Sequence, residues 1–260
     1  MLKIISSVVL CVACNASYAA LQIQSWTLSN GARVLFVENH TIPMLDVSVD
    51  FDAGSRRDPV SKSGTAALTG AMLARGIHAA PNGNEPALSE AQISDAFADT
   101  AAQRGGRLDD DRAGVTLRTL VTERETAVSL LARVLAYPSF PEEILKRDKA
   151  RTIAAIKESL TKPEAIAGKA FSKRLYGNHP YGQQPDVASI DAISRDDLLA
   201  FHRQYYVANR AVVALIGEKR EITLQMDVER YVRVVSFRPG AITYEPVSYT
   251  HLTLPTILLV

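Results

Sequence analysis

Apolar and polar residues alternate from Met44 to Phe51, and this pattern limits the possible folds of the chain more than any other feature. Its apolar positions are Leu45, Val47, Val49 and Phe51. Because successive side chains of a β-strand point to opposite faces, this pattern predicts a strand with one buried face. A sheet that is buried on one face needs a second layer to cover that face. The rest of the chain is therefore expected to supply further strands and the elements that cover them.

The other predicted strands occur in clusters, with helices between the clusters. Residues 26–38 predict a hairpin, because Asn30-Gly31 favours a two-residue hairpin turn. Strands are also predicted around Leu108, at 115–121 and at 211–216, with Gly105-Gly106 opening the first of them. Helices are predicted at residues 64–74, 89–102, 122–136, 142–176 (interrupted near Pro163) and 194–206. This order predicts an α+β fold, a mainly antiparallel sheet covered by helices.

The composition is that of an ordinary globular protein. The chain has 260 residues, of which 47% are apolar and 22% are charged, so disordered and fibrous classes are not expected. This length allows one large domain or two small ones. Twenty-nine basic and 28 acidic residues leave a formal charge of +1. Because no basic excess is available to bind a phosphate backbone, nucleic acid is not an expected partner.

The first 19 residues have the pattern of a secretory signal peptide. Lys3 is their only charged residue, residues 4–13 are mostly apolar, and small residues precede an expected cleavage after Ala19. The apolar run is too short to span a bilayer, which takes roughly 20 residues. The pattern predicts a periplasmic or secreted protein; the alternative is a lipid anchor at Cys14. Cleavage after Ala19 would remove Cys11 and Cys14, the two cysteines of the chain.

The end of the chain differs in composition from the rest. Residues 249–260 contain no Asp, Glu, Lys or Arg and finish in a short apolar run. The segment from Ser248 to Thr256 resembles a translated sequencing adapter, which predicts that residues 248–260 are a non-native tail on a fragment of a longer gene. The alternative is a genuine terminal strand.

Five segments resemble the pitrilysin/insulinase family of zinc metallopeptidases and follow one another in that family's order. They correspond to its L-x-N-G-x-x-V hairpin, its A-G-S-R strand end, its zinc-binding helix, its G-x-H-P-Y-G loop and its Y-x-P-x-N segment. In this chain they are residues 28–34, 52–56, 64–76, 177–182 and 205–209. The resemblance covers roughly residues 25–217. It implies an N-terminal family domain at 20–220 and a helix or linker toward a missing second domain at 221–247. The signal peptide at 1–19 and the tail at 248–260, inferred above from their own patterns, complete the predicted domain organisation.

The chain departs from that family at the zinc site. Active members carry H-x-x-E-H on one helix: the two His bind zinc, the Glu polarises the attacking water, and a later Glu completes the ligand set. On this frame Ala67 and Ala71 replace the two His, Gly70 replaces the Glu, and the distal ligand falls at about Ala154. Alanine and glycine side chains have no ligating atoms. The resemblance therefore implies a degenerate copy with no catalytic residue, no metal ligand and no cofactor.

Other residues of the chain offer no replacement for the lost site. No two of the five histidines are within four positions of each other; they are His40, His78, His179, His202 and His251. His78 shares a loop with Glu85. We interpret His179 as a capping residue, His202 as a packing residue, and the acidic run at residues 109–111 as a turn. A G-x-S-x-G nucleophile motif is absent, and Gly105-Gly106 has no phosphate-binding frame around it.

Non-catalytic copies in this family pair with active ones and close a chamber around a peptide. The resemblance thus implies a non-catalytic partner subunit of a periplasmic heterodimeric zinc metalloprotease, with zinc in the catalytic pitrilysin-type subunit. A peptide could bind by adding to an exposed strand edge. Two alternatives stay open: a stand-alone periplasmic peptide-binding or assembly module, and an active zinc metalloendopeptidase with an unorthodox site. No transmembrane helix is expected.

Overall fold

The computed structural model describes residues 22–80 and 85–217. Its centre is a six-stranded sheet with the order β1-β2-β8-β3-β7-β6. All neighbouring strands are antiparallel except β2 and β8, which are parallel. The strands are β1 (Ile23–Thr27), β2 (Arg33–Glu38), β3 (Met44–Phe51), β6 (Gln103–Leu108), β7 (Ala113–Leu120) and β8 (Ala211–Gly217). The predicted α+β class with a mainly antiparallel sheet is confirmed.

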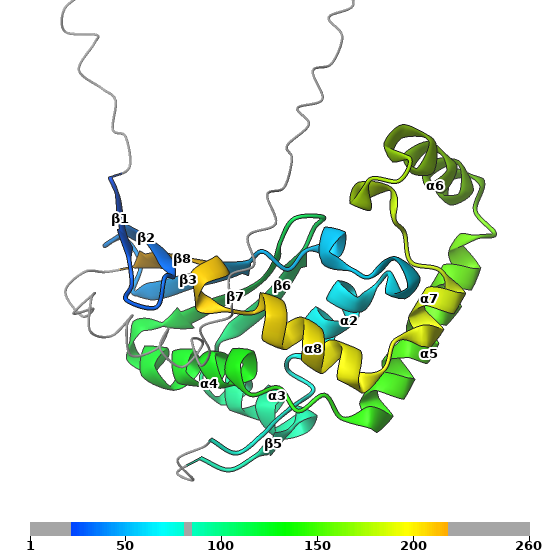
Figure 1. The fold of residues 1–260 in the computed structure, drawn as a ribbon. Helices are drawn as coiled ribbons and strands as arrows, with labels where there is room; N and C mark the ends of the chain where they lie inside the picture. Colours follow the sequence, from blue (N-terminus) through cyan, green and yellow to red (C-terminus); the bar gives the residue numbers. More distant parts are fainter. Residues whose placement is uncertain (1–21, 81–84, 218–260) are drawn as a thin grey trace, which may run out of the picture.

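Helices gather on one side of this sheet, as Figure 1 shows for α3 and α4. They are α2 (Thr65–Met72), α3 (Glu90–Asp99), α4 (Arg124–Ala136), α5 (Glu142–Ser159), α6 (Pro163–Tyr176), α7 (Val187–Ala192) and α8 (Arg195–Tyr205). A two-stranded sheet pairs β4 (Gly76–Ile77) with β5 (Leu88–Ser89). Short 3₁₀ turns are η1 (Ser55–Arg57), η2 (Val60–Lys62), η3 (Val121–Glu123), η4 (Pro180–Gly182) and η5 (Ala208–Arg210). In the part of the chain that is described, no helix is both long and apolar enough to cross a membrane.

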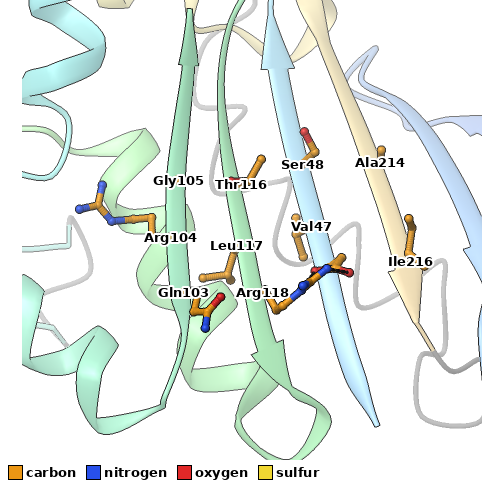
Figure 2. A pocket seen from close by; sticks show the side chains of 11 residues that line it. Val47, Ser48, Gln103, Arg104, Gly105, Thr116, Leu117, Arg118, Ala214 and Ile216 are labelled. Atoms are coloured by element: carbon orange, nitrogen blue, oxygen red, sulfur yellow. Dashed lines mark hydrogen bonds and ion pairs between the residues drawn. The ribbon is translucent and has the colours of Figure 1, made fainter. Parts of the chain in front are cut away.

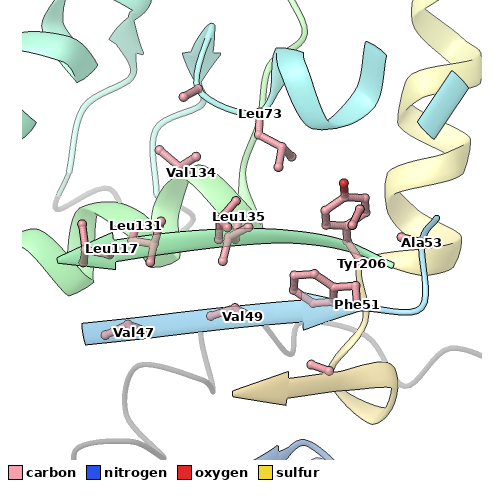
Figure 3. Close-up of a cluster of buried hydrophobic side chains, with 14 of the residues drawn as sticks. Val47, Val49, Phe51, Ala53, Leu73, Leu117, Leu131, Val134, Leu135 and Tyr206 are labelled. Carbon is pink, nitrogen blue, oxygen red and sulfur yellow. The ribbon is translucent and has the colours of Figure 1, made fainter. Parts of the chain in front are cut away.

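The alternation in β3 produces the core. Its four apolar residues are at most 6% exposed, and the residues between them are partly exposed. Figure 3 shows β3 and β7 facing α4, with Tyr206 beside Phe51. The buried side chains there include Val47, Val49, Phe51, Leu117, Leu131, Val134 and Leu135. Each such side chain contributes about 1.5–3 kcal/mol when it is fully buried, so the sheet and the helices stabilise each other.

The local signals place most elements correctly. Gly31 occupies the hairpin turn with φ +89°, and the Asn30 side chain accepts a hydrogen bond from the Ala32 N–H at 3.0 Å. Ser89 and Ser194 begin α3 and α8 with capping boxes. Pro163 separates two helices, α5 and α6, since proline fits the first turn of a helix but not its interior.

Four features differ from the sequence-based predictions. The strands β4 and β5, which form the two-stranded sheet, were not predicted. Gly105-Gly106 lies in the middle of β6 rather than at its entry. α7 was not predicted; it is only six residues long and begins with an Asp186 capping box. β8 was predicted as a strand, but its insertion between β2 and β3 was not, because strand order has no local signature. The predictions for residues 1–19, 221–247 and 248–260 lie outside the described residues.

The C-terminus of α3 gives a direct test of this local geometry. Ala101 adopts φ +50°, its N–H bonds to the Ala98 carbonyl, and the Ala102 N–H bonds to the Phe97 carbonyl. This is the Schellman arrangement, in which glycine is the favoured residue. Ala101→Gly is therefore expected to raise the free energy of unfolding by about 1 kcal/mol, because it removes left-handed strain.

Urea denaturation of the full chain measures this effect. Ala98→Gly is the control, since Ala98 is an exposed residue in the last turn of α3, and it is expected to lower stability by about 0.5–1 kcal/mol. Equal changes in the free energy of unfolding of both variants would contradict the assignment of left-handed strain to Ala101.

Candidate functional site

One face of helix α2 is exposed to solvent and carries only small side chains; we call it the bare face. Ala67, Gly70 and Ala71 are exposed, whereas the opposite face is fully buried against the core through Ala66, Leu68, Thr69 and Met72. Positions separated by three and four residues share one face of a helix, so the three exposed positions form one patch. These are the positions that the sequence analysis assigned to the lost zinc motif. The structure places them together, and none carries a donor atom.

The buried face of α2 is fixed by a cap on its first turn. The buried carboxylate of Asp58 accepts hydrogen bonds from the N–H groups of Gly64 and Ala66, both at 2.7 Å. These bonds satisfy two donors that a helix N-terminus otherwise leaves unpaired. Burial raises the pKa of Asp58 and outweighs the two hydrogen bonds, which act in the opposite direction. The orientation of α2, and with it that of the bare face, is thus set from inside the fold.

Helix α5 packs against α2 and carries the fourth position, Ala154, which is exposed. Asp148 lies on the same helix, six residues before Ala154, and is buried at 2% exposure. Its carboxylate lies near three guanidinium groups, at 3.5 Å from Arg75, 3.1 Å from Arg147 and 3.4 Å from Arg151. Asp148 therefore belongs to an ion-pair cluster between the helices.

The residues present do not fit a zinc ion. Zinc sites in proteins use Cys, His, Asp or Glu ligands, commonly three or four of them. Across residues 22–80 and 85–217, no three such side chains converge in a way that could hold a metal ion. Glu85 forms an ion pair with Arg133 at 2.8 Å, and the Asp109 side chain accepts hydrogen bonds from the N–H groups of Asp111 and Arg112 in the turn after β6. The turn interpretation of residues 109–111 is confirmed.

Comparison with known proteins places this fold. A model described as "Insulinase (Peptidase family M16)" matches residues 33–185, which is more than half of the chain. The chain belongs to the M16 peptidase family. A second model, "DNA polymerase III gamma and tau subunits C terminal", matches residues 208–258. The described part of that second match, residues 208–217, forms η5 and β8, and β8 is paired within the M16 sheet.

Several M16 relatives are similar over most of the chain. An "uncharacterized zinc protease YmxG" of Bacillus subtilis is 23% identical over 80% of this chain, and a "non-peptidase homolog YmxG" of Helicobacter pylori is 23% identical over 82%. The crystal structure of a "peptidase M16 inactive domain" from Pseudomonas fluorescens is 33% identical, with a TM-score of 0.76 over 85% of this chain. This chain covers 49%, 47% and 53% of the three, so it spans about half the length of these relatives.

This M16 chain is thus related to family members described as inactive or as non-peptidases. That relationship agrees with the absence of donor atoms on the exposed face of α2 and with a chain that has no zinc of its own. The resemblance drawn from the five sequence segments is confirmed at the level of the family.

Two histidines have the structural roles that the sequence analysis gave them. The Nδ1 atom of His179 accepts a hydrogen bond from the Tyr181 N–H at 3.2 Å and caps η4. His202 is partly buried on α8, where it stacks on Tyr206 and its Nε2 atom lies 2.7 Å from the Leu135 carbonyl. Because a carbonyl oxygen can only accept, the hydrogen bond assigns the neutral ring to the Nε2–H tautomer. Burial lowers the pKa of His202 to about 4.

The sequence analysis did not anticipate the contact that Tyr206 makes with the bare face. Tyr206 is buried, its ring lies 4.9 Å from that of Phe51, and its hydroxyl lies 3.7 Å from the point where a Cβ on Gly70 would be. Burial raises the pKa of this hydroxyl, so it stays protonated at neutral pH. The only sequence signal was the place of Tyr206 in the Y-x-P-x-N-like segment. A phenol therefore borders the patch where an active enzyme would hold its zinc ligands.

The second part of the candidate site is the edge of the sheet. β6 is an edge strand with β7 as its only sheet neighbour among the described strands, and α2 and α3 pack beside it. Five of its six residues are exposed. A Cβ on Gly106 would meet no atom closer than 4.0 Å. A hollow of about 500 Å³ lies across the outer face of β6, β7, β3 and β8. Figure 2 shows Gly105, Thr116, Ser48 and Ala214 side by side across these four strands.

The bare face of α2 makes a testable prediction at Gly70. Gly70→Ala is expected to raise the free energy of unfolding by about 0.5–1 kcal/mol, because alanine is the better helix former and its Cβ would make only an ordinary 3.7 Å contact with Tyr206. Gly64→Ala is the control. Gly64 has φ +103° and its Cβ would lie 2.4 Å from Ile190 Cδ1, so this change is expected to destabilise. Urea denaturation measures both, and a loss of stability in Gly70→Ala would show that the face is not free.

His202 predicts a specific acid sensitivity. The folded state holds the ring neutral down to a pKa of about 4, whereas the unfolded chain takes up the proton near pH 6.5. The unfolded state then binds more protons between these values, so stability is complete above pH 6.5 and falls by about 3 kcal/mol as the pH drops through 4.

The measurement is the difference between wild type and His202→Gln in the free energy of unfolding, followed from pH 7 to pH 4. Glutamine keeps a donor for the Leu135 carbonyl but does not titrate. The wild type should lose stability relative to the variant over this interval. Parallel curves would contradict the assigned role of His202.

Proposed function

We propose that this chain is a non-catalytic partner subunit of a periplasmic, heterodimeric M16 zinc metalloprotease, in which it helps to enclose and bind a peptide substrate. The observation that carries this proposal is the bare face of α2: residues 33–185 match the M16 family, and the resemblance puts Ala67, Gly70 and Ala71 where an active member would have its hydrolytic groups. The relatives described as inactive or non-peptidase support the same conclusion.

Peptide binding is supported by the edge of the sheet. Each residue of an edge strand whose N–H and C=O point away from its neighbour can pair with an added chain. β6 offers such an edge along six residues, and its two central glycines keep the approach clear of side chains. An extended peptide would take its affinity from these backbone hydrogen bonds and its register from side-chain contacts. This chain would hold the peptide, and the zinc of the catalytic subunit would activate the water that hydrolyses it.

The periplasmic location is part of the proposal and rests on the signal-peptide pattern of residues 1–19. The fragmentation pattern predicted for residues 221–260 is not needed for it. The exposed face of α2 and the edge of β6 both lie within residues 65–108, and the two elements pack together.

The first test measures metal content and peptide hydrolysis on one sample of the full chain. We expect less than one zinc per ten chains after equilibration with zinc and dialysis, and no hydrolysis of extended peptides. One tightly held zinc per chain together with chelator-sensitive cleavage would overturn the proposal in favour of an active enzyme.

The second test adds the M16 subunit that carries H-x-x-E-H from the same genome. Hydrolysis by that subunit is expected to rise at least tenfold when this chain is added in equimolar amount. A catalytic subunit that is equally active with and without this chain would favour a stand-alone peptide-binding module.

A further inference from the structure

The β6 edge is basic, and its charges are not equally compensated. β6 contains Arg104 and Arg107 and no acidic residue, and its neighbour β7 contains Arg118. Arg107 donates to the Asp50 carboxylate of β3 at 2.8 Å. Arg118 forms a two-point contact with Asp46 of β3, at 2.6 and 2.9 Å. Both of these arginines therefore have a carboxylate on the same face of the sheet.

Arg104 is different. In the described part of the chain it has no carboxylate within ion-pair distance, and its guanidinium lies over the Phe97 ring of α3, 5.5 Å from the ring centroid. The basic residue that influences it is Arg75, which is itself paired with Glu90 and Asp148. Partial burial of the guanidinium, followed by repulsion from Arg75, lowers the pKa of Arg104. The site thus has positive charge that its own residues do not neutralise.

The position of Arg104 suits contact with an added strand. Alternation along β6 puts Gln103, Gly105 and Arg107 on the outer face with Arg118 and Thr116, and it puts Arg104 on the other face, toward the helices. Figure 2 shows the Arg104 side chain extending past β6 on the side away from β7, where an added strand would lie. Side chains directly opposite each other on paired strands have Cβ atoms about 4.5–5.5 Å apart, so an acidic side chain there would reach the guanidinium.

We propose that Arg104 is a specificity-determining residue of the β6 edge, and that it selects peptides with an Asp or Glu side chain at the position paired with it. This inference rests on the peptide binding proposed above and adds the class of peptide. A carboxylate at that position would provide the partner that Arg107 and Arg118 already have. A different role for an edge arginine is to discourage pairing between sheets of two molecules, and the experiment separates the two.

The experiment measures binding of labelled ten-residue peptides to the full chain by fluorescence anisotropy. A neutral host peptide of high β-propensity is compared with versions in which one Gln is replaced by Glu, scanned through the central six positions. In wild type, we expect the Glu version at one position to bind about fivefold more tightly than the Gln host, and the advantage to shrink in high salt.

Three variants of the chain test which arginine causes the preference for the Glu peptide. Arg104→Gln is expected to abolish the Glu preference while leaving the affinity for the Gln host within twofold. Arg104→Lys is expected to retain part of the preference, because it keeps the charge. Arg107→Gln is the matched control on the same strand; since Asp50 already neutralises Arg107, the preference should persist.

The outcomes are distinct. Equal binding of Glu and Gln peptides by wild type, or a preference that survives in Arg104→Gln, would overturn the role of Arg104 and leave peptide binding intact. Increased self-association of Arg104→Gln with an unchanged Glu preference would assign Arg104 to protection of the edge. Binding of no peptide at all would overturn the proposed peptide binding, and the inference with it.

Discussion

One face of the six-stranded sheet is buried against the helices, and this packing sets the positions of the other elements. β3 lies between β8 and β7, and its apolar side chains meet α4 and the aromatic residues that follow α8. Helix α2 joins the same core through Leu68 and Met72, and Asp58 caps its first turn. Because one side of α2 is held in this way, its other side is directed to solvent. The candidate site is therefore a consequence of core packing.

This arrangement separates what positions helix α2 from what its exposed face can bind. Zinc affinity comes from donor atoms on the exposed face, whereas the position of the helix comes from contacts on the opposite face. Alanine and glycine at the exposed positions remove the first without disturbing the second. Nearby groups that could look catalytic have structural roles: His202 donates to a backbone carbonyl and stacks on Tyr206, and Asp148 sits among three arginines. The exposed face of α2 and the edge of β6 lie on neighbouring elements, so both belong to the candidate site.

Local structure was largely predictable from the sequence because its causes are local. The Asn30-Gly31 turn, the serine caps at Ser89 and Ser194 and the break at Pro163 each act within a few residues of the element they define. The errors occur where pairing over long distances decides. Gly105-Gly106 suggested a strand entry, but pairing with β7 extends β6 through both glycines. The contact of Tyr206 with the face around Gly70 also joins residues more than 130 positions apart, and no pattern near either residue indicates it.

That Ala67, Gly70 and Ala71 have no donor atoms follows from the sequence alone, and their assignment to the M16 zinc motif stays a prediction from the resemblance. The class of fold was also predictable from the sequence, because period-two burial and helix caps depend on neighbouring residues. The tertiary structure was needed to show that β6 lies at the edge of the sheet and that, among the described residues, no carboxylate is within ion-pair distance of Arg104. β8 closes the sheet between β2 and β3, and Asp46 and Asp50 of β3 reach Arg118 and Arg107 but not Arg104. Strand order and ion pairing join residues far apart in the chain, so they are fixed only when the sheet assembles.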